Sequence, residues 1–116
     1  MEPMETVQLL ASVDRQHALY ELTRTDEAIS MEDLARRVAA GRHRTQPETL
    51  DAGVVDRARV RMAHVHVPKL AASDVVSVDW DDDEVWLADG EAVDDVLETA
   101  GTFEQWPPDR DPRYPQ

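Results

Sequence analysis

The chain of 116 residues has no cysteine, a single lysine and few aromatic residues, with one Phe, three Trp and two Tyr. Without cysteine, disulfides and cysteine-ligated metal sites are excluded. No apolar run approaches the roughly 18 residues of a membrane-spanning helix, and no basic-then-apolar stretch of the secretory type opens the chain. The 41% of apolar residues are enough for one modest core. We therefore expect a cytoplasmic protein with a single folded domain and no membrane contact.

Sequence motifs for catalysis are also missing. The chain has only four glycines and contains neither a glycine-rich phosphate loop nor a recognisable nucleophile motif. Its Asp and Glu clusters fall in predicted turns or on helix surfaces, whereas acid–base catalysis needs a carboxyl group buried in a pocket. We expect a protein that is not an enzyme, uses no cofactor and has no identifiable small-molecule ligand.

Charge is abundant and unevenly distributed along the chain. The 25 acidic and 12 basic side chains give a net charge of −13, and eleven of the twelve cations are arginine. Residues 36–69, the basic island, hold eight cations and three anions. An acidic surface fits a protein that stays hydrated in concentrated salt, so we expect a halophilic source. An acidic protein from a GC-rich genome would explain the arginine bias equally well.

Apolar spacing predicts two helical regions in the first third of the chain. Residues 4–24 should form one helix, or two helices broken near Ser12, which is a plausible N-cap. A short extended link follows. Ser30 and Asp33 then match a capping-box pattern, with Asp in place of Glu or Gln. Gly41 is expected to end the second helical region as a left-handed C-cap.

The longest predicted helix follows an exposed loop at residues 42–50. Asp51 is expected to cap this helix, and Pro68 to kink or restart it near Val67, because proline lacks a backbone donor. The helix shows two apolar faces, more than a one-sided surface helix needs. One face contains Val60, Ala63, Val67 and Leu70, and the other contains Val54, Ala58, Met62 and Val65. The expected shared core includes Leu19, Leu34, Val60 and Leu70.

Beyond Asp74 the apolar period changes from helical to alternating. Val76 and Val78 alternate with polar residues, and three aspartates at residues 81–83 form a turn before Val85, so a β-hairpin is predicted. A last short helix should end at Gly101. The remaining residues, 102–116, include four prolines and are expected to form a flexible tail.

This order of elements is typical of a winged helix-turn-helix domain. The segment His64-Val65-His66-Val67-Pro68-Lys69-Leu70, followed by Ala71-Ala72-Ser73-Asp74-Val75-Val76, resembles an uncharacterised winged-helix domain family of halophilic archaea. The start of that family resembles residues 9–19, so the resemblance covers roughly residues 7–90. It implies a DNA-binding fold and a regulatory role. The predicted fold is α+β, mostly helical: a winged helix-turn-helix with three core helices, a hairpin wing and a C-terminal helix over residues 1–101.

The basic island supplies candidates for binding double-stranded DNA. Arg57, Arg61 and His64 share one helical stripe, where guanidinium groups could pair with guanine edges or phosphates. Arg42 and Arg44 on the preceding loop, and Lys69 near the helix end, are candidates for phosphate contacts. The predicted function is therefore that of a DNA-binding transcriptional regulator or DNA-associated protein that forms a homodimer.

One alternative to DNA binding remains open. Asp79, Asp81, Asp82, Asp83 and Glu84 place five carboxylates on or beside the hairpin turn, where a wing that contacts DNA would normally carry cations. The same scaffold could instead be a protein–protein interaction or dimerisation module, which would use the second apolar face of the longest helix, Trp86 and the last helix. A metal site is not expected, because His64 and His66 diverge on a helix.

Overall fold

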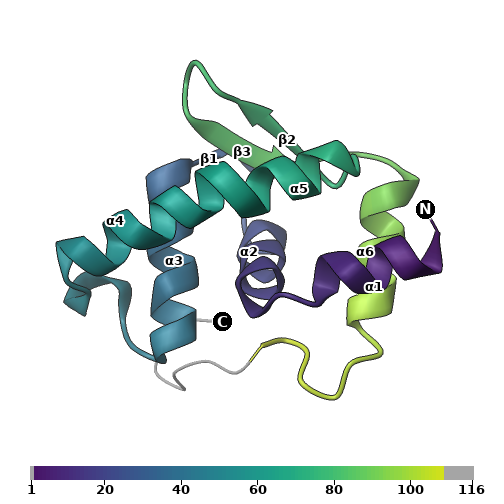
Figure 1. Cartoon of the computed structure of the whole chain (residues 1–116), viewed down its shortest axis with the longest axis horizontal. Helices are drawn as coiled ribbons and strands as arrows, with labels where there is room; N and C mark the ends of the chain where they lie inside the picture. The colour runs from purple at the N-terminus through teal and green to yellow at the C-terminus, as the bar shows by residue number, and fades with distance from the viewer. Residues whose placement is uncertain (1, 109–116) are drawn as a thin grey trace.

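The computed structural model describes residues 2–108 as a mostly helical α+β fold with a small antiparallel sheet (Figure 1). This confirms the α+β, mostly helical part of the predicted fold class. None of the described helices is long and apolar enough to cross a membrane. In chain order the elements are α1 Pro3–Leu10, α2 Val13–Thr23, β1 Ile29–Ser30, α3 Met31–His43, the 3₁₀ turn η1 Pro47–Thr49, α4 Ala52–Arg61, the π-helical turn η2 Met62–His66, α5 Val67–Ala72, β2 Val76–Asp79, β3 Glu84–Leu87 and α6 Glu91–Ala100.

Serine caps determine where α2 and α3 begin. The Ser12 hydroxyl accepts a hydrogen bond from the Arg15 backbone N–H at 3.2 Å, so the N-terminal region forms two helices with the break at Ser12. The Ser30 hydroxyl accepts in the same way from Asp33 at 3.0 Å. These two hydrogen bonds confirm both predicted caps. Each cap was predictable because it depends only on residues that are close together in the sequence.

Gly41 does not end α3, and this prediction was wrong. The helix continues through Gly41 to His43 and ends at Arg44, whose φ of 54° is left-handed. The predicted loop at residues 42–50 is accordingly shorter and contains η1. A Cβ atom on Gly41 would lie 2.5 Å from Nδ1 of the buried His17. The glycine is therefore needed for the close packing of α3 against α2.

The helix predicted to be longest is continuous but changes its winding. It comprises α4, η2 and α5, and is called here the third helix. Asp51 occupies the N-cap position without a side-chain capping bond. The Val67 N–H donates to the Met62 carbonyl, five residues back, and α5 starts at Val67 with Pro68 in its first turn. The expected restart at Val67 is confirmed, and the π-helical turn accommodates a proline that would otherwise clash within an α-helix.

The π-helical turn also changes which residues of the third helix are buried. Val60 is 58% exposed and Val65 is 51% exposed, so the two apolar faces predicted from a uniform wheel were wrong at these positions. A π-helical turn uses one residue more than an α-helical turn, so the residues that follow it are rotated relative to those that precede it. Val67 and Leu70 therefore no longer lie on the same face as Val60. Leu19, Leu34 and Leu70 are fully buried as expected, without Val60. The buried residues of the third helix are Val55, Ala58, Met62, His66, Val67 and Leu70.

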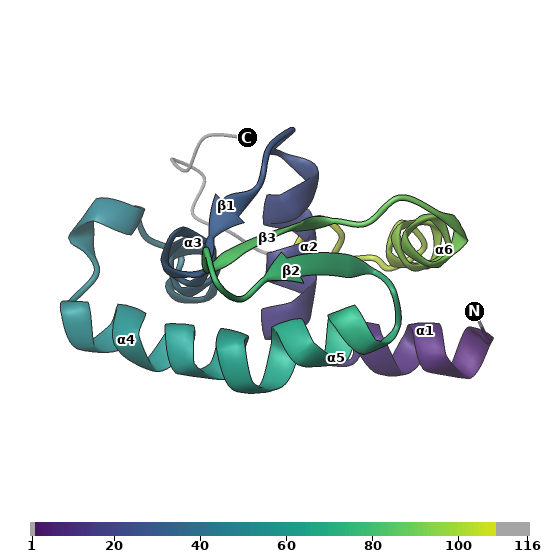
Figure 2. The same cartoon turned by 90° about the horizontal axis from the view of Figure 1, so that it is seen from above.

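The sheet has the strand order β1-β3-β2 and is antiparallel throughout. Val85 of β3 pairs with Ile29 of β1 and with Val78 of β2, so their side chains share the face turned toward the core. This confirms the predicted hairpin. Seen from above, β2 and β3 cross over α2, and α5 runs alongside them (Figure 2); contacts join α5 to β2 and α2 to β3. The sheet thus closes one side of the helical core.

The C-terminal part of the described chain packs back onto the helices. Helix α6 lies against α1 (Figure 1). Beyond it, Phe103 and Trp106 pack on the core, and the Trp106 ring meets the Tyr20 ring edge-on with 6.0 Å between the ring centres. The rest of the predicted tail, residues 109–116, lies outside the described residues.

Candidate nucleic-acid interface

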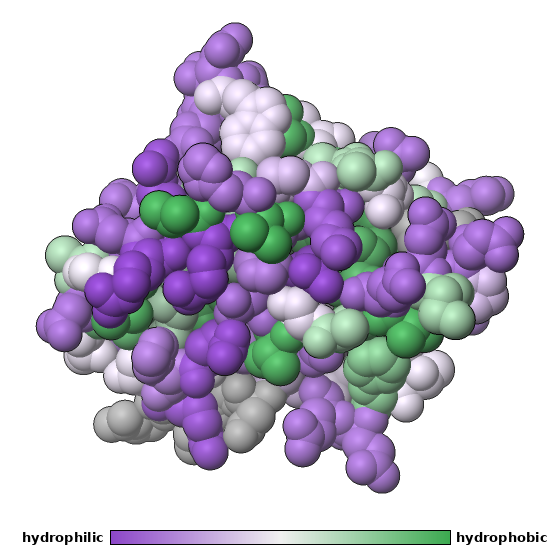
Figure 3. Space-filling model, viewed as in Figure 1, coloured by the Kyte–Doolittle hydropathy of each residue, from purple (hydrophilic) through white to green (hydrophobic). Residues whose placement is uncertain are grey.

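The third helix crosses the front of the molecule as one long rod (Figure 1). Residues 57–73 of this helix and its end contain four cations, Arg57, Arg59, Arg61 and Lys69, and no carboxylate. The face that it crosses is mainly hydrophilic, with separate hydrophobic patches (Figure 3). In a chain with a net charge of −13, residues 57–73 are the longest carboxylate-free stretch that carries several cations.

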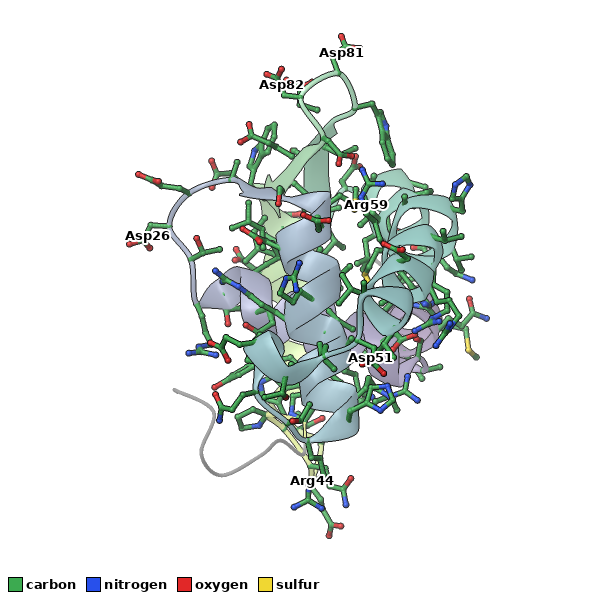
Figure 4. The ribbon with its side chains drawn as sticks, turned by 90° about the vertical axis from the view of Figure 1, so that its left-hand side faces the viewer. Asp26, Arg44, Asp51, Arg59, Asp81 and Asp82 are labelled. Atoms are coloured by element: carbon green, nitrogen blue, oxygen red, sulfur yellow. The ribbon has the colours of Figure 1, made fainter. Side chains whose placement is uncertain are left out.

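All six candidate DNA-binding side chains are exposed, but they lie on different elements. Arg57 and Arg61 belong to α4, His64 to η2 and Lys69 to α5. Arg42 lies in the last turn of α3, and Arg44 follows at the end farthest from the hairpin tip (Figure 4). The structure brings two of the six, Arg42 and Arg61, together at one carboxylate.

That carboxylate belongs to Asp14, in the first turn of α2, whose side chain is only 9% exposed. Arg42 Nη1 donates a hydrogen bond to Asp14 Oδ1 at 2.5 Å. Arg61 Nε lies 3.4 Å from Oδ2, and His66 Nε2 lies 3.3 Å from the same oxygen. We call these four residues the Asp14 centre. It joins side chains of α2, α3, α4 and η2, and its acidic member was missed by sequence reasoning.

Arg15 fixes the protonation of His66 in this centre. Its Nε donates to the Leu9 carbonyl at 2.7 Å, its Nη2 donates to Gln8 at 3.0 Å, and its Nη1 lies 3.2 Å from His66 Nδ1. Because a guanidinium group only donates, His66 Nδ1 must accept, which places the imidazole proton on Nε2, facing Asp14. In this arrangement His66 donates through Nε2 to the Asp14 carboxylate.

These contacts keep Asp14 ionised. The hydrogen bond from His66 lowers the pKa of Asp14 most, burial opposes this effect, and Arg42 adds a hydrogen bond and its charge. The balance holds the pKa of this carboxyl well below its usual range. At neutral pH the centre therefore combines two guanidinium cations with one carboxylate.

A second contact holds the hairpin turn against α4. Arg59 Nη2 donates to Asp83 Oδ2 at 2.5 Å, and this hydrogen bond is the main cause that raises the pKa of Arg59. The Asp83 carbonyl also accepts from the Met31 N–H at 2.9 Å. Asp81 and Asp82 lie beyond this contact at the tip of the hairpin (Figure 4). One of the five hairpin carboxylates is thus paired with α4, whereas these two reach into solvent.

Apolar groups interrupt the basic surface of the third helix. Val60 and Val65 are more than half exposed, and an open hollow of about 370 Å³ is lined by Asp56, Arg57, Val60 and Arg61. On the hairpin, Trp80 is 52% exposed and Trp86 38%. These groups give the surface some capacity for apolar contact.

The two histidines of the His-x-His segment diverge as helix geometry predicts. His64 is exposed, whereas His66 is buried against Asp14 and Arg15. Among residues 2–108, no three His, Asp or Glu side chains are placed to hold a metal ion. His66 therefore acts as a hydrogen-bonded member of the helix junction.

The chain belongs to a family defined by a domain of unknown function (DUF7344), whose model matches residues 7–86. The matched segment begins in α1 and ends in β3, so it contains the Asp14 centre, the third helix and nearly all of the hairpin. Neither a curated protein nor a solved structure matches the chain.

Proposed function

We propose that this protein is a winged-helix DNA-binding protein, a transcriptional regulator or DNA-associated protein of a halophile. The order of α2, β1, α3, third helix and hairpin supports this proposal, because β1 pairs with β3 as the third strand of the sheet. In such a domain the third helix enters the major groove and the hairpin forms the wing. The DUF7344 match covers these elements.

The observation that carries the proposal is the charge of the third helix. Its residues 57–72 hold four cations and no carboxylate, although the whole chain carries 25 carboxylates. A local positive surface on an exposed helix is what recognition of a polyanion requires. Arg57 and His64, both exposed, are the proposed base-reading residues.

The hairpin limits how the DNA can be oriented. Asp81 and Asp82 at the tip would repel phosphates, and the Arg59 contact holds the turn close to α4. We therefore infer that the DNA backbone approaches the third helix on the side away from the hairpin tip. The wing would then exclude one docking orientation through charge repulsion.

Salt decides which contacts can contribute in a halophile. Neutralising roughly five phosphates gives a slope near −4.5 in log K against log salt, so a rise from about 0.15 M to about 2 M costs about five decades of affinity. Charge attraction alone would fail under these conditions. Specific binding must then depend on base-edge contacts from residues such as Arg57.

The test is fluorescence anisotropy on duplexes selected for binding and on random duplexes, at several KCl concentrations. Arg57→Ala should reduce the preference for selected duplexes by roughly 5- to 150-fold, the equivalent of about 1–3 kcal/mol for a base contact. Arg24→Ala, which removes the same charge at the C-terminal end of α2, should leave the preference unchanged. Equal binding of selected and random duplexes by the unmodified protein at every salt concentration would overturn the proposal.

A second candidate function is self-association without DNA binding. It is favoured by the exposed Val60 and Val65, since exposed aliphatic side chains on a helix that also carries arginines suit a protein interface. Light scattering coupled to size exclusion should then show a dimer that Val60→Asp together with Val65→Asp converts to a monomer. A monomeric protein at all concentrations would remove this candidate.

A further inference from the structure

We infer that Arg42 and Arg61, held by the buried Asp14, form a clamp for a single backbone phosphate of the bound nucleic acid. The inference rests on the proposed function and assigns a separate role to part of the same surface. Exposure differs strongly within the Asp14 centre. The Asp14 carboxylate is 9% exposed, whereas the Arg42 and Arg61 side chains are 45% and 48% exposed. A ligand that approaches from solvent therefore meets the two guanidinium groups before the carboxylate.

Each guanidinium group engages Asp14 through one nitrogen. Arg42 uses Nη1 and Arg61 uses Nε. A guanidinium group has five N–H donors in a planar fork, so donors on the remaining nitrogens of each arginine can reach a second anion. Phosphate oxygens match this fork geometry and commonly accept two parallel hydrogen bonds from one arginine.

The two arginines are close enough to share one ligand. They contact the two oxygens of a single carboxylate, Arg42 at Oδ1 and Arg61 at Oδ2. The charge of the centre also suits an anion, since the Arg42 and Arg61 guanidinium cations outnumber the single carboxylate and Arg15 adds a further cation that interacts with Asp14. A phosphodiester group carries one negative charge.

Hydrogen bonds and ion pairs restrain the side chains of the centre before any ligand binds. His66 contacts the Asp14 carboxylate, and Arg15 contacts the other ring nitrogen of His66. The remaining Arg15 donors bind the carbonyls of Leu9 and Gln8. An arginine side chain normally loses much rotamer freedom when it binds. Arg42 and Arg61 have already lost part of it to Asp14, which makes Asp14 a positioning residue for the clamp.

This assignment changes the role predicted for Arg61 from its helical stripe. The stripe placed Arg61 with Arg57 among the base-reading candidates, whereas its ion pair with Asp14 directs it toward Arg42 at the end of α3. Arg57 and His64 remain available for the bases. Loss of Arg61 should therefore weaken all duplexes alike.

A double-mutant cycle tests whether the two arginines share one phosphate. Arg42→Ala and Arg61→Ala should each lower the steepness of log K against log KCl by about one, with no change in sequence preference. The double variant should also lose about one, because both side chains serve the same phosphate. A loss of about two would show two independent phosphate contacts and overturn the clamp.

The Asp14→Asn variant distinguishes two effects of Asp14 on DNA binding: the positioning of Arg42 and Arg61, and the repulsion of phosphate by its negative charge. The substitution removes a negative charge, so charge attraction alone would strengthen DNA binding. If Asp14 positions the arginines, binding weakens instead, equally for all duplexes, in a variant that circular dichroism shows to be folded. Stronger binding by folded Asp14→Asn would overturn the positioning role, and the Arg42 and Arg61 cycle tests the clamp even if this variant does not fold.

Inorganic phosphate provides a test that does not need DNA. In spectra of the ¹⁵N-labelled chain, phosphate should shift the Nε–H signals of Arg42 and Arg61 together with one saturation curve, and equal ionic strength of KCl should not. If phosphate shifts neither signal while Arg57→Ala still alters sequence preference, the clamp is wrong and the proposed function stands. If phosphate shifts both signals while no duplex binds at any salt, the anion site stands and its assignment to a DNA backbone is wrong.

Discussion

Two aspartates, Asp14 and Asp83, each accept a hydrogen bond from an arginine at 2.5 Å, in very different surroundings. The two arginines are equally accessible, with 45% and 47% of the side chain exposed. The carboxylates differ, since Asp14 is 9% exposed and Asp83 is 38% exposed. Asp14 also contacts Arg61 and His66, whereas the Asp83 contact joins one arginine to a turn. Burial of the acid, rather than the distance of the ion pair, distinguishes them.

The physical reason lies in the solvent that each carboxylate has lost. An exposed pair replaces water contacts by a screened attraction and contributes little to stability. A buried carboxylate has given up its water, so it depends on its protein partners, and those partners depend on it. The comparison therefore predicts that the buried junction of α2, α3 and α4 responds strongly to substitution and that the outer side of α4 responds weakly.

The largest expected effect is that of Asp14→Asn. The amide places a donor against Arg61 and His66, so the free energy of unfolding should fall by about 3 kcal/mol, as when one partner of a buried ion pair is removed. The matched substitution Asp83→Asn keeps a residue that tolerates the positive φ of 56° at this position, and its cost should be far smaller. Urea unfolding followed by circular dichroism measures both. Equal losses would contradict the contrast between the two sites.

The contrast between a buried and an exposed position can also be tested by replacing two glycines, Gly41 and Gly53, with alanine. Gly41→Ala would place a methyl group 2.5 Å from the buried His17 ring, so the variant should lose about 1–3 kcal/mol as an overpacked core does. Gly53 lies exposed in the first turn of α4, and its nearest neighbour would be Arg57 at 3.4 Å. Gly53→Ala should gain up to about 1 kcal/mol from helix propensity. Thermal melts should therefore move in opposite directions, and a gain for Gly41→Ala would show that α2 and α3 pack less closely than described.

A pH dependence specific to Asp14 tests the same contrast in the unmodified protein. Its pKa in the folded protein lies below the ordinary value of 3.8, so the unfolded chain binds the proton first as the pH falls. The stabilisation is complete well above pH 3.8, shrinks as the pH falls through that value, and disappears below the folded pKa. The difference in unfolding free energy between the unmodified protein and Asp14→Asn should follow this course. A difference of the same size at pH 3 and pH 7 would contradict it.

Local features of the fold were predictable from the sequence. The caps at Ser12 and Ser30 and the alternation of Val76 and Val78 all depend on residues close together in the chain. The exposure of Val60 was not predictable from a uniform helical wheel, which places Val60 on the same face as Val67 and Leu70. The π-helical turn η2 lies between them and shifts the phase of the last two, so they are buried while Val60 is exposed. Gly41 follows the usual pattern of a C-cap, and only the packing of His17 shows its other role.

The sequence was enough to predict the two arginines of the candidate site, but it did not predict the aspartate that they contact. Arg42 and Arg61 stood out because they lie in a basic island within an acidic chain. Asp14 is 28 residues from Arg42 in the sequence, and an Asp in the first turn of a helix is common for local reasons alone. Only the packing of α2 against α3 and α4 brings this carboxylate to the two arginines.

The π-helical turn η2 has a consequence for insertions and deletions within the chain. A π-helical turn holds one residue more than the α-helical turn it replaces, so removing one residue between Met62 and His66 should restore uniform α-helix rather than break it. Such a deletion requires that Pro68 be replaced as well, since a uniform helix brings its ring against the carbonyl of the preceding turn. The extra residue and the proline are therefore a linked pair: the third helix tolerates both together, or neither.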